Sequence, residues 1–181
     1  MVTVFVEGPV EESLLTQLLA DLPAAGRVRI VAAGGRDDAR PRARKELLVQ
    51  QRPVILVIDA DSIDRDIIGE QQRDLEDYFA WGAGGVPYRV LQFVPTVEAI
   101  FFDRPEVLEH LLGRKPDDIM LAAGEIAPKA VLQRMGITDL RDRVRALSDA
   151  DLQMLRTHPS IAAIREFVEE NTESTLLRKS A

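Results

Sequence analysis

The stretch V-I-L-V-I-D-A-D-S, residues 54–62, indicates the fold class. Its five consecutive apolar residues, with no polar residue between them, are typical of a strand covered on both faces, as in the parallel sheet of an α/β protein. The apolar run ends at Asp59, and Asp61 follows two residues later. The segment therefore predicts a buried strand with two carboxylates at its carboxyl end.

The sequence on either side of this strand alternates between strand-like and helix-like segments. Short apolar, β-rich runs predict strands, whereas apolar residues at helical spacing and stretches rich in helix-forming residues predict helices. The predicted strands are residues 2–6, 27–33, 54–59 and 88–94, and the helices between them are residues 9–22, 38–51 and 67–81. Parallel strands joined by helices form a three-layer arrangement, so we expect an α/β fold with a four-stranded, mainly parallel sheet flanked by helices.

From Thr96 onward the sequence predicts helices almost throughout, punctuated by prolines and glycines that start and stop them. The candidate helices are residues 96–102, 105–112, 128–135, 148–156 and 159–171. We therefore expect an α/β core over residues 1–102 and a helical extension over residues 103–181 that packs on this core.

Composition limits the classes of function. The chain has 181 residues, 46% of them hydrophobic, which is enough for a sizeable core. It has no cysteine, which excludes disulfides, thiolate zinc sites and cysteine nucleophiles. No apolar run approaches the roughly 18–20 residues that cross a bilayer, and the N-terminus does not resemble a signal peptide. We expect a cytoplasmic protein without membrane partners.

The formal net charge of −7 opposes nonspecific binding to nucleic acid, whose affinity comes largely from neutralising phosphates. Divalent cations held by carboxylates would reverse the local charge and let such a site attract a phosphate. The negative charge is therefore compatible with a nucleic-acid partner only where metal ions or local basic patches intervene.

Ligands of open parallel sheets bind beyond the carboxyl ends of the strands. The polar residues and glycines there are Glu7 and Glu11 after the first strand, Gly34 and Gly35 after the second, Asp59 and Asp61 after the third, and Glu98 after the fourth. Carboxylates gathered at one edge raise one another's pKa unless a cation neutralises them. Because the chain offers oxygen ligands, two histidines and no cysteine, we expect Mg²⁺ or Mn²⁺.

Each of these residues also has a purely structural interpretation. Glu11 is in a position to complement a helix dipole, and Glu98 to cap a helix that starts near Thr96. Asp59 and Asp61 are common turn formers, as are the two glycines. The occurrence of carboxylates at three of the four predicted strand ends favours a shared site over these separate interpretations.

The motifs V-F-V-E-G-P-V-E-E-S-L-L and V-I-L-V-I-D-A-D-S, with a glycine after the second strand, resemble the Toprim domain of topoisomerases, primases, small recombination proteins and overcoming-lysogenization-defect nucleases. The likeness covers residues 2–102, and V-P-T-V-E-A-I-F-F resembles the nuclease branch and small standalone Toprim-like proteins of microbial defence systems. It implies a Toprim/Rossmann-like fold, with Glu7 acting as metal ligand or general base. It also implies that Glu11 and Asp59 help to hold one metal ion, and that Asp59 and Asp61 hold another.

Ile63 departs from the topoisomerase and primase pattern, which has an acidic residue at this position. The chain also has no candidate zinc-binding domain. A metal-dependent nuclease acting on DNA or RNA is therefore the leading hypothesis. The chain has no P-loop, so an ATPase partner would be a separate chain.

Several further residues are candidates for contacts with nucleic acid or substrate. Lys129 is the candidate cation for the scissile phosphate, and Ser62 and Glu98 are additional site candidates. The glycine pair with Arg36, Arg40 and Arg42 is expected to contact the nucleic-acid backbone, although a solvated helix face is the alternative interpretation. We expect Trp81 to pack in the core or against a helix rather than to stack on bases.

Two other functions remain open. The chain could be a non-catalytic Toprim-like subunit that binds metal or nucleic acid within a complex. The strand ending in D-A-D-S also resembles haloacid-dehalogenase phosphatases, whose first aspartate is a nucleophile, although those enzymes place the motif at their first strand.

Overall fold

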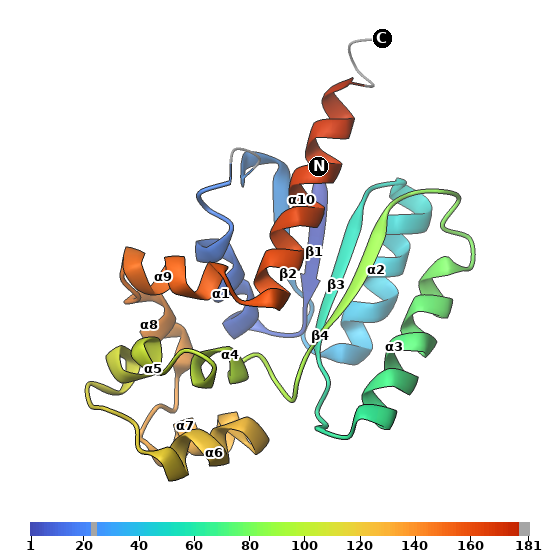
Figure 1. The fold of residues 1–181 in the computed structure, drawn as a ribbon. Helices are drawn as coiled ribbons and strands as arrows, with labels where there is room; N and C mark the ends of the chain where they lie inside the picture. Colours follow the sequence, from blue (N-terminus) through green and yellow to red (C-terminus); the bar gives the residue numbers. More distant parts are fainter. Residues whose placement is uncertain (23–24, 178–181) are drawn as a thin grey trace.

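The computed structural model describes residues 1–22 and 25–177. In this part of the chain a four-stranded sheet has the order β2-β1-β3-β4, and every neighbouring pair is parallel (Figure 1). The strands are β1 (Val2–Val6), β2 (Val28–Ala32), β3 (Val54–Asp59) and β4 (Tyr88–Phe93). The predicted α/β class is confirmed, and each strand lies within a residue or two of its predicted position.

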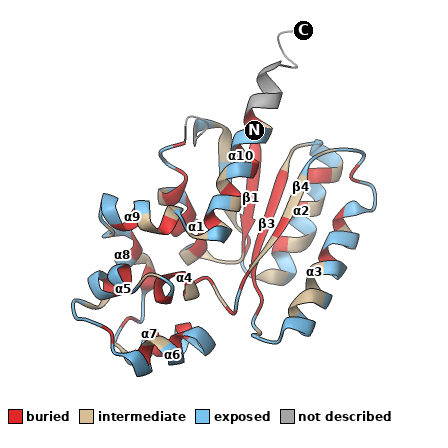
Figure 2. Cartoon of the chain, viewed as in Figure 1, coloured by how far each residue is buried: buried red, intermediate tan, exposed pale blue. Residues whose placement is uncertain are grey.

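Both faces of the sheet are covered, as the uninterrupted apolar runs predicted (Figure 2). Alternate residues of a strand point to opposite faces. Val2, Val4 and Val6 accordingly join one buried cluster, whereas Phe5 joins the other. Helices α1 (Pro9–Leu18) and α10 (Pro159–Leu177) contribute to the first cluster, and α2 (Arg36–Gln50) and α3 (Arg65–Ala80) to the second. The core is therefore a three-layer sandwich.

The helices α2 and α3 both begin two residues earlier than predicted. Helix α3 starts early because the Asp64 side chain caps it, accepting hydrogen bonds from the backbone N–H of Asp66 at 2.9 Å and of Ile67 at 3.4 Å. Helix α2 starts directly after Gly35, whose φ of 127° is readily adopted only by glycine. A short 3₁₀ turn, η1 (Ala25–Arg27), precedes β2.

The segment after β4 is helical, as predicted. Its helices are α4 (Ala99–Phe102), α5 (Pro105–Leu112), α6 (Asp118–Ile126), α7 (Pro128–Arg134), α8 (Leu140–Arg145), α9 (Asp149–Arg156) and α10. Helices α6 and α8 were not predicted. Each begins after an aspartate cap: Asp117 accepts from the Met120 N–H at 2.7 Å, and Asp139 accepts from the Arg141 N–H at 2.9 Å.

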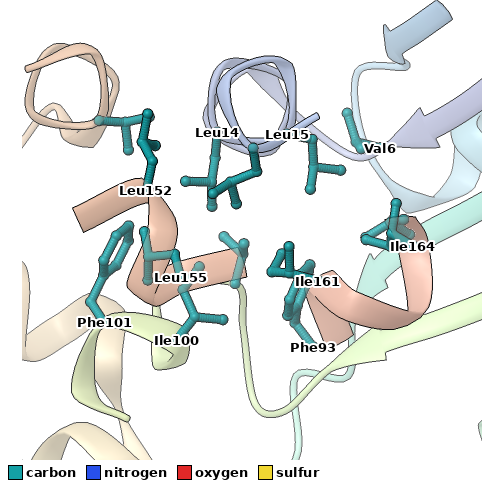
Figure 3. Close-up of a cluster of buried hydrophobic side chains, with 14 of the residues drawn as sticks. Val6, Leu14, Leu15, Phe93, Ile100, Phe101, Leu152, Leu155, Ile161 and Ile164 are labelled. Carbon is teal, nitrogen blue, oxygen red and sulfur yellow. The ribbon is translucent and has the colours of Figure 1, made fainter. Parts of the chain in front are cut away.

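The helices after residue 102 share a hydrophobic core with the sheet. Leu152 and Leu155 of α9 and Ile161 and Ile164 of α10 pack among side chains from α1 and β4 (Figure 3). Phe93 belongs to the same cluster. The division of the chain at residue 102 stays a prediction, and residues 178–181 of the predicted extension lie outside the described part. None of the described helices is both long and apolar enough to cross a membrane.

Candidate functional site

Four acidic residues at the carboxyl edge of the sheet line one cavity of about 510 Å³. Glu7 follows β1, Glu11 lies in the first turn of α1, Asp59 ends β3, and Glu98 directly precedes α4. The strands are parallel, so their carboxyl ends meet at the same edge. The fold therefore brings together residues that are up to 91 positions apart in the sequence, Glu7 and Glu98.

The opposite wall of the cavity comes from the helical segment. Lys129 at the start of α7 is exposed and lines the cavity together with Leu132 of the same helix. Asp139 and Arg141 also line it and form an ion pair of 2.7 Å with each other. Asp139 and Arg141 were not predicted as site residues, because their part of the sequence gave no clear helix signal and no recognised motif.

Asp59 is almost completely buried, with 8% of its surface exposed, and its Oδ1 accepts a hydrogen bond of 2.8 Å from the Val97 backbone N–H. Burial raises the pKa of Asp59 to about 8, and the nearby charges of Glu11 and Glu98 add to this rise. Burial also raises the pKa of Glu11, which is 9% exposed, with smaller contributions from Glu98 and Glu7. Ionising these carboxyls together is therefore unfavourable in free energy.

Glu98 is 6% exposed and accepts a hydrogen bond of 2.6 Å from the Thr96 hydroxyl. It occupies the cap position before α4, but its side chain makes no capping hydrogen bond. The capping interpretation is therefore wrong, because the carboxylate lines the cavity and is held by Thr96. Thr96 lies in the quoted V-P-T-V-E-A-I-F-F motif, but its partnership with Glu98 was not predicted.

The glycine pair holds the backbone of Glu7. The N–H groups of Gly34 and Gly35 donate to the Glu7 carbonyl at 3.0 Å and 2.9 Å. Both glycines have positive φ, 94° and 127°, which L side chains rarely adopt. The carboxylate of Glu7 is held independently, because its Oε1 accepts a hydrogen bond of 3.0 Å from the Asp59 N–H. The glycine pair thus fixes the position of Glu7 relative to the start of α2.

Arg36 forms ion pairs with two of the predicted metal ligands. Its Nη2 lies 2.8 Å from Asp61 Oδ2 and its Nε lies 3.4 Å from Glu7 Oε1. It also donates to the carbonyl oxygen of Asp59. Asp61 itself is exposed, has a left-handed φ of 53° and does not line the cavity. Arg36 thus faces carboxylates in this arrangement, whereas the sequence predicted a contact with nucleic acid.

The remaining predicted residues lie outside the cavity. Ser62 Oγ accepts from the Asp64 N–H at 3.0 Å, which helps to start α3. Arg42 donates to the Ala33 carbonyl at 3.1 Å. Arg40 lies instead over the ring of Tyr78, with its Cζ 5.4 Å from the ring centre.

The donor set suits a divalent cation in its chemistry, since it consists of carboxylates with hard oxygen ligands and contains no histidine or cysteine. Across residues 1–22 and 25–177, however, no group of three or more His, Cys, Asp or Glu side chains is arranged to hold one ion. The carboxylates of Glu7 and Asp61 are turned toward Arg36 instead. Binding of an ion by the predicted ligands would require these side chains to reorient.

A scan against protein-family models and a search of curated proteins gave no match. Two solved structures are similar to this one. The C-terminal region of the Burkholderia pseudomallei OLD protein aligns over 94% of this chain and 98% of its own, with a TM-score of 0.63 and 15% identity. The C-terminal region of the Xanthomonas campestris pv. campestris OLD protein aligns over 99% and 98%, with a TM-score of 0.58 and 14% identity. The chain therefore has the OLD-type, Toprim-like α/β fold of these C-terminal regions.

Proposed function

We propose that the chain is a divalent-metal-dependent nuclease that hydrolyses phosphodiester bonds in DNA or RNA. The observation that carries this proposal is that the three buried carboxyls of Glu11, Asp59 and Glu98 lie together without a paired cation from the described residues. They line a single open cavity, and none of them has an ion-pair partner among the described residues. Buried carboxylates are stable only when they are protonated or paired with a cation, so the site suits a positively charged ligand.

The proposed ligands are Glu7, Glu11, Asp59 and Asp61, with Glu98 as an additional carboxylate of the cavity. Bound Mg²⁺ or Mn²⁺ would activate a water molecule and stabilise the leaving oxygen. Glu7 would hold a metal ion or take the proton of that water, and its hydrogen bond from the Asp59 N–H keeps it at the strand edge. Lys129, on the opposite wall, would neutralise charge on the scissile phosphate.

Two further observations support a nuclease. The E-G-x-x-E and D-x-D-S motifs resemble those of Toprim nucleases, and the carboxyl ends of β1 and β3 place both motifs at one sheet edge. The fold is shared with the C-terminal regions of OLD proteins. We propose that the substrate enters between the sheet edge and α7.

The test compares wild type with Glu7→Gln on supercoiled plasmid, single-stranded DNA and RNA in Mg²⁺ or Mn²⁺. We expect cleavage by wild type, its loss in EDTA, and its loss in Glu7→Gln. Glu12→Gln is the matched control, because Glu12 is near Glu7 but does not line the cavity. Equal cutting by wild type and Glu7→Gln would contradict the proposed site. Release of phosphate from a small phosphoester without nucleic-acid cleavage would support a phosphatase instead.

A further inference from the structure

The basic residues of α2 are divided between two flanks of the helix. Ala39, Ala43 and Leu47 form its buried row against the sheet. The flank next to this row on the α3 side bears arginines at four-residue spacing, namely Arg36, Arg40 and Arg44. The other flank bears Arg42 and Glu46, which line a hollow beside β2 together with Arg29.

Two arginines of the first flank are stacked on aromatic rings of α3 and its C-terminal end. The Cζ of Arg44 lies 4.4 Å from the centre of the Tyr78 ring and 5.4 Å from that of Trp81. Arg44 also donates to the Trp81 carbonyl at 3.3 Å. Arg40 also lies over Tyr78, with its Cζ 5.4 Å from the ring centre. We call these four residues, Arg40, Arg44, Tyr78 and Trp81, the Arg-aromatic surface.

Trp81 is 79% exposed, so the prediction that it packs in the core or against a helix is wrong. The glycines that follow it, Gly82 and Gly84, end the helix, and the indole is left at the surface. An exposed tryptophan beside stacked arginines leaves a large aromatic face available to a ligand.

Within the described part of the chain, neither Arg40 nor Arg44 forms an ion pair, although the chain has a net charge of −7. The Nε of Arg44 is buried and has no hydrogen-bond partner. Stacking holds the guanidinium groups in place, so they lose little freedom when they bind an anion.

The Arg-aromatic surface lies on the same flank of α2 as Arg36, which contacts the proposed site. Arg36 contacts Glu7 and Asp61 at the sheet edge, and Arg40 and Arg44 follow it along the same flank. Eight helical residues span about 12 Å, which is the length of roughly three or four stacked nucleotides. A strand leaving the cavity past Arg36, whose charge is shared with Glu7 and Asp61, would next meet Arg40 and Arg44 over Tyr78.

We propose that the Arg-aromatic surface binds single-stranded nucleic acid, with phosphates on Arg40 and Arg44 and an unpaired base stacked on Trp81. This inference rests on the proposed nuclease function for the identity of the strand. Single-stranded binding sites combine a basic track with aromatic side chains, because the face of every base can stack on a ring. The bases of a duplex are already stacked on one another, so the indole has access to an unpaired base only.

Trp81 is the only tryptophan of the chain, so its fluorescence reports this surface directly. Oligo(dT) is titrated into the protein in EDTA, where metal-dependent cleavage is absent. We expect saturable quenching of Trp81, weaker quenching by a duplex, and little quenching by an abasic oligonucleotide that retains the phosphates. The quenching midpoint should rise steeply with salt.

Substitutions on the two sides of α2 test which side binds the oligonucleotide. Arg40→Ala and Arg44→Ala should each weaken binding about 5- to 20-fold, as expected for loss of one charge-assisted phosphate contact. Lys45→Ala is the matched control, since it removes the same charge from the side of α2 that lines the hollow beside β2 and should weaken binding less than about 2-fold. Far-ultraviolet circular dichroism and the melting temperature establish that each variant is folded.

Three results would overturn the inference: no quenching by oligo(dT), equal quenching by the abasic strand, or an equal loss of affinity in Lys45→Ala and Arg44→Ala. Cleavage in Mn²⁺ by a protein that fails to bind oligo(dT) at Trp81 would leave the proposed function standing and refute only this surface. Quenching by oligo(dT) in a protein that does not cleave would instead refute the nuclease proposal.

Discussion

The guanidinium group of Arg36 lies between the carboxylates of Glu7 and Asp61, with Nε 3.4 Å from the first and Nη2 2.8 Å from the second. Arg36 therefore partly neutralises two of the four proposed metal ligands. A divalent ion at these carboxylates would compete with Arg36 for the same oxygen atoms. The structure thus contains an internal cation at the edge of the proposed metal site.

Replacing Arg36 with glutamine should tighten metal binding, because Glu7 and Asp61 lose their competing partner. The ion pairs are partly solvated, so we expect a decrease of about 3- to 10-fold in the Kd for Mn²⁺, on the order of 1 kcal/mol. Isothermal titration calorimetry measures this constant without a nucleic-acid substrate. The matched control is Arg40→Gln, because Arg40 forms no ion pair with a carboxylate of residues 1–22 or 25–177. Weaker Mn²⁺ binding in Arg36→Gln than in wild type would show that Arg36 supports the site and does not compete for it.

The stability of the protein in EDTA should fall as the pH rises from about 5 to about 8. Burial raises the pKa of Asp59 to about 8 and also raises that of Glu11. Between the ordinary aspartate pKa and about 8, the folded state therefore binds more protons than the unfolded state. The free energy of unfolding is highest at the acidic end of this window and falls as the pH rises through it. The carboxyls with lowered pKa, such as Asp21, change stability below this window.

Asp59→Asn should make the free energy of unfolding less dependent on pH, because the substitution removes the carboxyl whose pKa is raised to about 8. The variant should gain stability relative to wild type near pH 8, on the order of a few kcal/mol at most. Urea unfolding at several pH values measures the effect. A slope in Asp59→Asn as steep as that of wild type would place the titrating group elsewhere.

Mg²⁺ or Mn²⁺ should raise the melting temperature of wild type, since a ligand that binds only the folded state stabilises it. At a concentration of about 100 times the Kd the gain is roughly 2.7 kcal/mol. Asp59→Asn should lose this gain, because it removes a charged oxygen from the proposed ligand set. Differential scanning fluorimetry with and without metal provides the comparison. A metal-dependent gain that persists unchanged in the variant would place the ion at another site.

Gly124→Ala should destabilise the protein, although alanine is the better helix former. A Cβ at position 124 of α6 would lie 1.9 Å from Cδ1 of Phe102, so the ring or the helix would have to move. Overpacking of this kind costs about 1–3 kcal/mol. Gly69→Ala in α3 is the control, because its Cβ would meet only the end of the Arg73 side chain at 3.5 Å. That control should stabilise by up to about 1 kcal/mol. Equal melting temperatures for Gly124→Ala and wild type would mean that α6 packs more loosely on α4 than the structure indicates.

The strands and the acidic sheet edge could be predicted because they depend on local signals. An apolar run such as residues 54–58 marks a buried strand, and parallel topology then gathers the residues that follow each strand. Glu7 and Asp59 lie at this edge for that reason. Helices α6 and α8 were not predicted because their apolar pattern is short and their aspartate caps are common in turns as well.

Interactions that depend on side chains from distant elements could not be predicted in this way. The basic run after Gly35 predicts positive charge, but not that Arg36 turns to Glu7 and Asp61 while Arg40 and Arg42 lie on opposite flanks of α2. These positions depend on where α2 packs against the sheet and α3. The exposure of Trp81 has a similar origin, because an aromatic residue near a helix end is buried only when another element covers it.

The central claim is that the carboxylates at the sheet edge hold divalent metal, and Mn²⁺ soaked into crystals tests it most directly. The account predicts an anomalous difference peak in the cavity within coordination distance of Glu11 and Asp59, roughly 2.0–2.4 Å from their oxygens. Arg36 should be displaced from Glu7 or Asp61 in the same crystal. A Mn²⁺ peak away from these side chains, or no peak while Arg36 keeps both ion pairs, would contradict the account.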